Sequence, residues 1–545
     1  MNAERVIAEH GRLLDAVNHP YEVQRELLAT VLEHNAHTAF GLEHGLEAVR
    51  TVEELRRAVP IRTHEEMMPW IERTMDGERN VLTADDPVVY FSSSGTTGHE
   101  KHIPVTRTYM ESTFLPFLHA AFAPLLQTLP QALAAPEAVL NLWQDPTAPI
   151  RRTRKGQPHI GASQVDYREF GEASALGPGS GATWGRIPEE LVSAIPWDRS
   201  YYKLRLAAEQ DIRLFLCVNP AMVAALPYQL RVLWPRLVED IAAGSLDGRP
   251  HAAPNPDRAK EIERHARTFG TVHPYHLWPR LSAVFVWNSA LASLYLPRVR
   301  EMYGPGVQLV SAPVASCEGP VAVPVDLAPG APLYLPGCVY EFVPADGPLL
   351  ADSETLLVSE LEENQDYHVI LSHVGGLYRC AVNDVVRVVG RLGRTPRVEY
   401  AGRNIVRSAA GEALTEAAAL RALRAACHDT GAEIRNATYH LDSRGTGNGG
   451  HYRIAVAFAG PPQRSLAGAL DTRLSEQCDG YRAGRRSGLI EPLEVVAVHQ
   501  DAFQREWERT VRAGQRPPRV KDRIFAPSEE AWTRITAQKP EIAVV

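Results

Sequence analysis

The sequence predicts an α/β fold, with a large N-terminal domain in residues 1–402 and a smaller α+β domain in residues 403–545. Short apolar runs such as IRLFLCV, residues 212–218, are typical of strands in a parallel sheet that is covered on both faces. Residues 281–319 give the order strand, helix, strand, which predicts a right-handed crossover unit of such a sheet. A chain of 545 residues is long enough for two to four domains and a large core.

The N-terminal domain is expected to begin with helices and to end with a β subdomain. Apolar positions three and four apart predict a series of helices over residues 1–58, and a further helix is predicted over 106–126. Thr51 is the expected N-cap of a helix in which Glu54 completes a capping box. Between residues 332 and 390, short apolar runs alternate with turns, which predicts a small antiparallel or barrel-like subdomain.

The C-terminal part alternates helices and strands. A helix is predicted over 412–428, followed by the strands ATYHLDS and HYRIAVAFAG and by a helix in RSLAGALDTRLSEQC. This order predicts a compact α+β unit of ordinary domain size.

Composition and charge limit the classes of function. Apolar residues make up 45% and charged residues 22% of the chain, as in an ordinary soluble globular protein. The net charge of −8 argues against nucleic acid as a partner. The six cysteines are scattered without a C-x-x-C pair, and no signal-like or membrane-spanning segment is visible. We therefore expect a cytoplasmic protein with no membrane partner, whose oligomeric state the sequence leaves open.

A serine-rich segment, FSSSGTTGHEKHIPVT at residues 91–106, is the clearest functional signal. The apolar run PVVYF predicts a buried strand before it, and the two glycines allow the backbone to approach an anion closely. The hydroxyl groups add short donors, and the lysine adds a positive charge. We expect this loop to hold the β- and γ-phosphates of ATP, through Ser93, Ser94, Gly95, Thr96, Thr97 and Lys101.

The loop has no Gly-Lys-Ser/Thr ending and so is not a P-loop. It resembles the corresponding loop of adenylate-forming ligases. Within that superfamily, SSSGTT followed by Lys101 and Ile-Pro resembles the Gretchen Hagen (auxin-responsive promoter) family of acyl-acid amido synthetases, as do the preceding segments HNAHTAFG and VPIRTHEEMMPWIERTMDGERNVLT. The resemblance implies a firefly-luciferase-like large domain and a mobile C-terminal domain. The many Ala, Arg and Pro residues suggest a bacterial member.

A second motif, VASCEG, follows a predicted strand, where α/β folds place their ligands. Glu318 is the candidate metal ligand and a candidate catalytic residue, because Mg²⁺ prefers carboxylate and phosphate oxygens. The superfamily pattern here is Tyr-x-Ser-(Ser/Thr)-Glu, and this resemblance places Ser316 in the nucleotide site. The chain departs from the pattern at Val314, where the superfamily has an adenine-stacking Tyr, and at Cys317. A simple turn at the end of a strand is the alternative.

A third motif, GLYRCAVNDVV at residues 376–386, resembles the family pattern of Gly-Leu-Tyr-Arg, four residues and Asp-Val. A carboxylate at Asp384 can accept hydrogen bonds from both hydroxyl groups of a ribose. The family usually has Gly before this aspartate. Here the residue is Asn383, which tolerates a positive φ better than most residues. The alternative is that Asp384 is an aspartate of a surface turn.

The C-terminal domain is expected to supply charge near the phosphates. The resemblance makes Arg403 a candidate ATP ligand or domain-pairing residue, while a lysine that many relatives have nearby is replaced by Ala413. Family members often bring a lysine to the α-phosphate from the pattern Gln-x-Lys-x-Pro-Arg. In AGQRPPRVKDRIF that spacing is one residue short, so we assign the catalytic role to Lys521, with Arg516 or Arg519 as the alternative.

Together these motifs imply an ATP- and Mg²⁺-dependent acyl-acid amido synthetase. Such an enzyme activates a small carboxylic acid as acyl-AMP with release of pyrophosphate, and transfers the acyl group to an amine or amino acid. Two alternatives are a ligase that forms a thioester with CoA or a carrier protein, and a non-catalytic nucleotide-binding relative. The sequence does not identify the acid or the amine. Trp278, Trp287 and Phe117 are candidates either for the acyl pocket or for the core.

Overall fold

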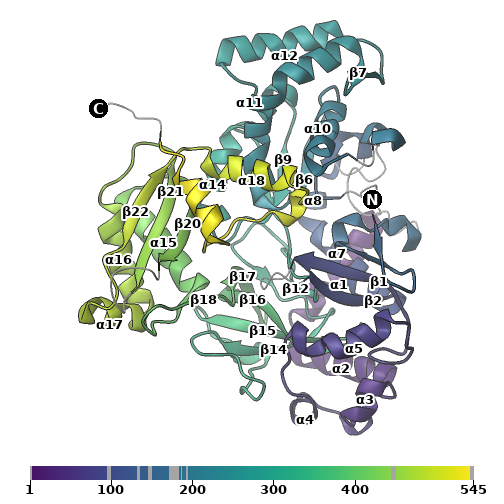
Figure 1. Cartoon of the computed structure of the whole chain (residues 1–545). Coiled ribbons are helices and arrows are strands. Elements are labelled where there is room, and N and C mark those ends of the chain that lie inside the picture. The colour runs from purple at the N-terminus through teal and green to yellow at the C-terminus, as the bar shows by residue number, and fades with distance from the viewer. Residues whose placement is uncertain are drawn as a thin grey trace. The chain divides into compact units, whose positions relative to one another are not determined.

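The computed structural model describes residues 3–94, 100–131, 135–144, 150–170, 183–185, 187–191, 194–442 and 450–540. The chain forms two compact units, whose helices and strands are labelled in Figure 1. The first unit contains Met1–Ser193, Leu214–Leu216 and Val310–Tyr400, and the second contains Ala194–Arg213, Cys217–Leu309 and Ala401–Val545. The division into domains 1–402 and 403–545 stays a prediction.

The first unit begins with helices, as the apolar spacing predicts. They are α1 Ala3–Ala16, α2 Pro20–Asn35, α3 Ala39–Glu43, α4 Val52–Ala58 and α5 His64–Met75. The predicted capping box of α4 is confirmed, because the Thr51 hydroxyl accepts from the Glu54 N–H and the Glu54 carboxylate accepts from the Thr51 N–H. The predicted helix over 106–126 forms as α6 Arg107–Tyr109, a π-helical turn Met110–Phe114, α7 Leu115–Ala121 and α8 Ala123–Thr128.

Two sheets form the centre of the first unit. One has the order β2-β1-β5-β4, made of β1 Pro87–Ser94, β2 Glu100–Thr106, β4 Arg151–Arg152 and β5 Pro158–Ile160. The other has the order β13-β17-β16-β15-β14, made of β13 Ala331–Pro332, β14 Val339–Pro344, β15 Asp366–His373, β16 Leu377–Leu392 and β17 Thr395–Arg403. Its strands β14, β15 and β16 pair antiparallel and lie side by side in Figure 1, which confirms the predicted β subdomain.

Shorter strands complete the first unit. β3 Val139–Asn141 pairs in parallel with the first residues of β6 Leu214–Val218, so the run IRLFLCV is a strand of a parallel pair, as predicted. β11 Val314–Ala315 and β12 Pro320–Ala322 form a two-stranded sheet around the VASCEG motif. One apolar cluster joins the N-terminal helices to both larger sheets and includes Leu28, Ile71, Phe91, Tyr340 and Val386.

The GLYR motif is a structural element of the β subdomain. Gly376 has a φ of +92°, and a Cβ at this position would lie 2.9 Å from the Leu82 side chain. The Tyr378 hydroxyl donates to the Leu82 carbonyl at 2.7 Å. The Arg379 guanidinium donates to the Glu341 carboxylate at 2.8 and 3.1 Å. These contacts tie the start of β16 to the segment before β1 and to β14.

The second unit combines a helical part with the C-terminal sheet. Its helical part contains α10 Pro196–Ala207, α11 Pro220–Ala243, β7 Ser245–Leu246, β8 Arg249–Pro250, α12 Pro256–Phe269, α13 Pro274–Leu277, β9 Ala283–Val286, α14 Ala292–Glu301 and the start of β10 Gln308–Ser311. The apolar stretch 281–297 therefore forms a buried strand followed by a helix, as predicted. No helix in the described ranges is both long and apolar enough to cross a membrane.

The C-terminal part is an α+β sheet unit, as predicted. β20 Ile434–Asp442 pairs antiparallel with β21 His451–Phe458, which pairs in parallel with β22 Glu494–Val498. The remaining elements are β18 Val406–Arg407, β19 Leu414–Thr415, α15 Glu416–Thr430, α16 Leu466–Gln477, α17 Asp479–Ser487, α18 Ala502–Arg512 and α19 Glu529–Thr536. Trp532 and Ile535 of α19 pack against the alanines of β21, and α15 and α16 lie beside the sheet in Figure 1.

Ala413, just before α15, has a strained backbone. Its φ is +52° and its side chain is exposed. We expect Ala413→Gly to raise the free energy of unfolding by about 0.5–1 kcal/mol, because relief of the left-handed strain exceeds the entropic cost of glycine. Urea unfolding measures this change. Ala513→Gly is the control, since Ala513 is also exposed but has a φ of −74° and should lose stability. A loss of stability in both variants would contradict the prediction.

Candidate active site

The serine-rich segment forms the β1–β2 hairpin. In the backbone register Ser93 pairs with Lys101 and Ser94 pairs with Glu100. Strand β1 thus extends beyond the apolar run that ends at Phe91, because backbone pairing with β2 does not depend on apolar side chains. Residues 95–99 lie outside the described residues, and the phosphate-binding role stays a prediction for Ser93, Ser94, Gly95, Thr96 and Thr97.

Lys101 and Glu318 form a buried ion pair. Lys101 Nζ lies 2.6 Å from Glu318 Oε1, and the two side chains are only 11% and 4% exposed. The two residues are 217 positions apart in the sequence. Strand β2 supplies the lysine, and the turn between β11 and β12 supplies the glutamate. The structure therefore brings together the cation of the first motif and the carboxylate of the second.

The ion pair is charged at neutral pH. Burial by itself raises the pKa of Glu318, but the charge and hydrogen bond of Lys101 outweigh it and leave the pKa below its ordinary value. Burial likewise opposes the charge on Lys101, while Glu318 raises the pKa of Lys101 above its ordinary value. The charge of each group thus offsets the free-energy cost of burying the other, and either charge alone would be costly to bury.

Ser316 lies in the turn that presents Glu318. Its N–H donates to the Gly319 carbonyl at 3.1 Å and closes the turn. Its hydroxyl is near enough to the Glu318 carboxylate to help to lower the pKa of that group. Within the described part of the chain, the buried Ser316 Oγ has no partner with full hydrogen-bond geometry. Val314 and Cys317, where the chain departs from the superfamily pattern, pack partly buried against the core.

Two buried histidines, which no sequence motif indicated, border the ion pair. His64, at the start of α5, is 3% exposed, and its Nε2 lies 3.1 Å from the His102 carbonyl oxygen. Burial lowers the pKa of His64, and the charges of Glu318 and Lys101 act on it in opposite directions. His373, at the end of β15, contacts the Glu318 carbonyl, and burial lowers its pKa to about 4.

Asp384 lies on β16 where the ladder with β15 is interrupted. Residues 382–384 of β16 stand opposite Val369 alone, which makes a bulge. Bulges re-aim side chains and are frequent next to active sites. Asp384 is half-buried at this bulge. Asn383 does not have a positive φ, so the glycine-like conformation anticipated for it is not used.

The remaining predicted residues belong to the second unit. The Lys521 ammonium lies 4.6 Å from the ring centre of Trp287. The Asn219 side chain donates to the Val520 carbonyl at 2.9 Å and so holds the segment that carries Lys521. Arg403 ends β17, and its N–H donates to the carboxylate of Glu416 at 2.8 Å. The roles of Lys521 and Arg403 toward ATP stay predictions.

The three aromatic candidates for the acyl pocket differ in burial. Trp278 and Phe117 are 1% and 2% exposed and belong to the core. The Trp278 indole N–H donates to the Ala207 carbonyl at 2.9 Å, so its polar atom is already satisfied. Trp287 is only partly buried and faces Lys521.

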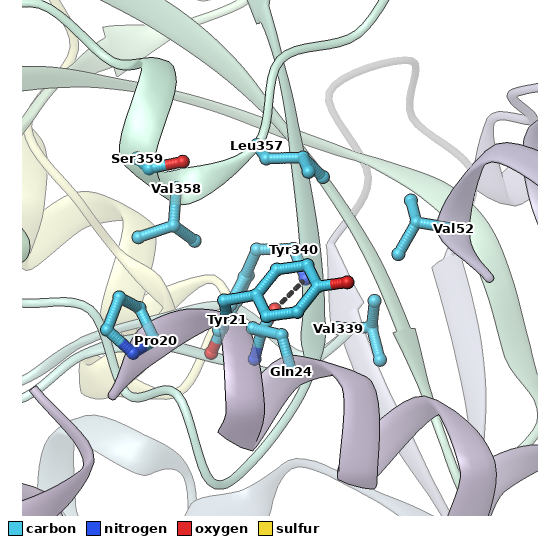
Figure 2. A pocket seen from close by; sticks show the side chains of 9 residues that line it. All are labelled: Pro20, Tyr21, Gln24, Val52, Val339, Tyr340, Leu357, Val358 and Ser359. Carbon is cyan, nitrogen blue, oxygen red and sulfur yellow. Dashed lines mark hydrogen bonds between the residues drawn. The ribbon is translucent and has the colours of Figure 1, made fainter.

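Figure 2 shows a small pocket between α2 and β14, with a volume of about 30 Å³. None of its nine lining residues is charged, and neither Lys101 nor Glu318 is among them. The Gln24 amide donates to the Leu335 and Cys338 carbonyls and accepts from the Tyr340 N–H. A pocket without a cation, whose main polar side chain is satisfied, does not suit a polyphosphate.

The donors around the ion pair suit Mg²⁺ when phosphates complete its coordination. In the ranges that the structure describes, no group of three or more His, Cys, Asp or Glu side chains could hold a metal ion by itself. Mg²⁺ is usually held by one or two carboxylates together with substrate phosphates. The Glu318 carboxylate, with the Ser316 hydroxyl beside it, offers oxygen donors of this kind.

Comparison with known proteins agrees with the motifs. Family models match the chain in three parts: the GH3 family N-terminal domain at residues 9–309, the central domain at 332–403 and the C-terminal domain at 417–530. "Probable indole-3-acetic acid-amido synthetase GH3.12" of Oryza sativa subsp. japonica is 26% identical, with 94% of this chain and 92% of that protein covered. "Jasmonoyl--L-amino acid synthetase JAR6" of Nicotiana attenuata is 25% identical, with 94% and 91% covered. These relatives are plant proteins, so the expected bacterial origin is not borne out.

The fold comparison gives the same assignment. "AtGH3.15 acyl acid amido synthetase in complex with 2,4-DB" has a TM-score of 0.80 and 20% identity, with 99% of this chain and 97% of that chain covered. This similarity confirms the predicted adenylate-forming α/β fold. The Oryza sativa protein and the AtGH3.15 structure are both named as amido synthetases, which are ligases. From the family models that span most of its length, the chain belongs to the GH3 family.

Proposed function

We propose that the chain is an ATP-dependent acyl-acid amido synthetase, which joins a small carboxylic acid to an amine or amino acid. One observation carries the proposal: the buried ion pair between Lys101 and Glu318, which come from the two motifs expected at the polyphosphate. Membership of the GH3 family supports the same reaction, because the relatives compared above are named as amido synthetases of indole-3-acetic acid and of jasmonate.

In the first half-reaction a carboxylate oxygen attacks the α-phosphorus of ATP. The bond from that phosphorus to the bridging oxygen breaks, pyrophosphate leaves with the electron pair, and acyl-AMP forms. Lys101 would bind the polyphosphate, together with donors of residues 93–97, and Asp384 would accept hydrogen bonds from the ribose. Lys521 would stabilise the charge on the α-phosphate.

Mg²⁺ is the expected metal of this step, with Glu318 as its protein ligand and Ser316 beside it. Bound Mg²⁺ supplies positive charge that neutralises the polyphosphate and helps pyrophosphate to leave. Because Lys101 pairs with Oε1 of Glu318, the lysine and the metal would share this carboxylate beside the polyphosphate.

In the second half-reaction the amine nitrogen attacks the acyl carbon of acyl-AMP. The bond between the acyl carbon and the phosphate oxygen breaks, AMP leaves with the electron pair, and the nitrogen loses a proton to solvent. The chain's contribution here is to hold the two reactants in the geometry of attack.

Hydroxamate formation tests the proposal across a library of carboxylic acids, with hydroxylamine as a universal acceptor. The expected result is hydroxamate, AMP and pyrophosphate in equal amounts for at least one acid. Parallel reactions with amino acids and with CoA distinguish an amide from a thioester product. Acid-dependent exchange of pyrophosphate into ATP that stays at background for every acid would overturn the proposal.

Asp384→Ala tests the ribose contact. We expect the KM for ATP to rise about 10- to 100-fold, since hydrogen bonds to a charged acceptor are each worth about 1.5–3 kcal/mol. Steady-state exchange kinetics with ATP and with 2′,3′-dideoxy-ATP measure the effect. The wild type should discriminate between the two nucleotides and the variant should not. Asp352→Ala, at an exposed aspartate of the same unit, is the control. Equal discrimination by Asp384→Ala and the wild type would exclude the contact.

A further inference from the structure

The peptide that carries Glu318 is held by a buried histidine of β15. His373 Nε2 lies 2.8 Å from the Glu318 carbonyl oxygen, and His373 Nδ1 lies 3.0 Å from the Gly375 amide nitrogen. Because the Gly375 N–H can only donate, Nδ1 is the acceptor and the proton is on Nε2. The imidazole is therefore neutral, has one tautomer, and donates to the Glu318 carbonyl.

The surroundings of His373 fix its ring in place. The side chain is completely buried, and its ring centre lies 4.4 Å from that of Tyr109. A Cβ at Gly375 would lie 2.9 Å from the imidazole, so only glycine leaves room for the ring. A Cβ at Gly319 would lie 3.2 Å from Cys338 Sγ. The turn that carries Glu318 thus packs closely against the β subdomain at Gly319.

We infer that His373 is a positioning residue, which sets the direction of the Glu318 carboxylate by fixing the carbonyl of the same residue. This inference rests on the proposed function, in which Glu318 binds Mg²⁺ together with the nucleotide. The hydrogen bond from His373 holds the peptide that follows Glu318 within the short turn between β11 and β12. Its loss lets the turn shift, which moves the Cα of Glu318, and with it the carboxylate, from the position in which it would meet the metal. Partners that orient a metal ligand typically contribute about 10- to 100-fold to metal affinity.

The same hairpin carries both the support and the ribose candidate. His373 ends β15, and Asp384 lies on β16, which pairs with β15. The β15–β16 hairpin therefore carries both Asp384 and the histidine that holds the Glu318 peptide. Sites built on rigid strands keep their geometry better than sites on loops.

Two substitutions in the full-length protein separate the donated hydrogen bond from the packing. Leucine in His373→Leu fills much of the space but has no donor, whereas glutamine in His373→Gln keeps an N–H near the position of Nε2. Mn²⁺ binding in the presence of ATP is measured by electron paramagnetic resonance. The Mg²⁺ concentration for half-maximal pyrophosphate exchange is measured in parallel.

We expect His373→Leu to weaken both metal responses about 10-fold or more, with an unchanged KM for the carboxylic acid. His373→Gln should recover most of the loss. If His373→Leu does not fold, His373→Met replaces it, because the flexible methionine side chain fills an irregular space and also has no donor. Metal responses equal to those of the wild type in the folded variants would overturn the inference.

Two control variants show whether a weaker metal response comes from the position of Glu318 or from a general loss of stability. Tyr378→Phe removes another buried side-chain hydrogen bond to a backbone carbonyl, at 2.7 Å from Leu82, in the same unit. It should lower the melting temperature but leave the metal responses unchanged. Equal responses in Tyr378→Phe and His373→Leu would mean that His373 is merely structural. Glu318→Gln tests the underlying function, because unchanged Mn²⁺ binding in that variant would refute the metal role of Glu318 itself.

Discussion

Lys101→Met is expected to lower acid-dependent exchange of pyrophosphate into ATP by about 10²- to 10³-fold, the usual value of one preorganised charge contact in a transition state. Methionine keeps an unbranched side chain of similar length but removes the ammonium group. The polyphosphate then loses its cation, and the Glu318 carboxylate, with 4% exposure, loses its partner. Exchange at saturating acid and ATP measures the effect.

The same substitution is expected to lower the free energy of unfolding by about 3–5 kcal/mol at neutral pH, as for other buried charges left without a partner. In the wild type Lys101 holds the pKa of Glu318 below its ordinary value, so the carboxylate contributes stability that is lost as the pH falls through that lowered pKa. Without Lys101 burial, which is the largest influence and raises the pKa of Glu318, is opposed only by the smaller effects of Ser316 and of the backbone. The loss in the variant should therefore shrink as the pH falls toward about 4.3, the ordinary pKa of glutamic acid.

Urea unfolding at pH 7 and at pH 4.5 checks this dependence. Lys155→Met, at an exposed lysine of the same unit, is the matched control and should change stability by less than about 0.5 kcal/mol. Adding Glu318→Gln to Lys101→Met removes the unpaired charge and should restore stability but not exchange. If the Lys101→Met variant is as stable as the wild type at pH 7, then loss of Lys101 does not leave a buried, unpaired charge on Glu318, and the prediction is wrong.

Arg379→Met is expected to cost about 3–5 kcal/mol of unfolding free energy, because Arg379 is the main partner of a buried carboxylate. Arg379 is 3% exposed, and it donates to Glu341 at 2.8 and 3.1 Å and to the Val59 carbonyl at 2.7 Å. The arginine of the GLYR motif thus stabilises the fold. The KM for ATP of the folded variant should equal that of the wild type.

Arg56→Met supplies the comparison for Arg379. The Arg56 guanidinium also donates to Glu341, at 2.9 Å, but its side chain is 25% exposed. Its loss should cost only about 1 kcal/mol, the typical value of one hydrogen bond. Urea unfolding of both variants at pH 7 measures the difference. Equal costs, or a KM for ATP that rises only in Arg379→Met, would contradict a purely structural role for Arg379.

Much of the fold was accessible from local patterns. The helices of the first 58 residues, the capping box at Thr51 and the buried strand before α14 follow from apolar spacing and cap chemistry, which act over a few residues. The end of β1 was missed, because strand pairing to Ser94 depends on β2 and not on the composition of the segment. The bulge before Val385 has the same origin, since it depends on how β15 and β16 align.

The sequence by itself determined the chemistry that the chain can offer: a serine- and threonine-rich loop with a lysine, a glutamate after a strand and an aspartate after GLYR. Only the tertiary structure decided which of these groups meet. It pairs Lys101 with Glu318, which lies 217 residues further along the sequence. It also brings His373 into hydrogen-bond distance of the Glu318 carbonyl and Arg379 into hydrogen-bond distance of the Glu341 carboxylate. The physical reason is that a side chain finds its buried partner through strand register and turn geometry, whereas a local pattern records only what each residue is able to donate or accept.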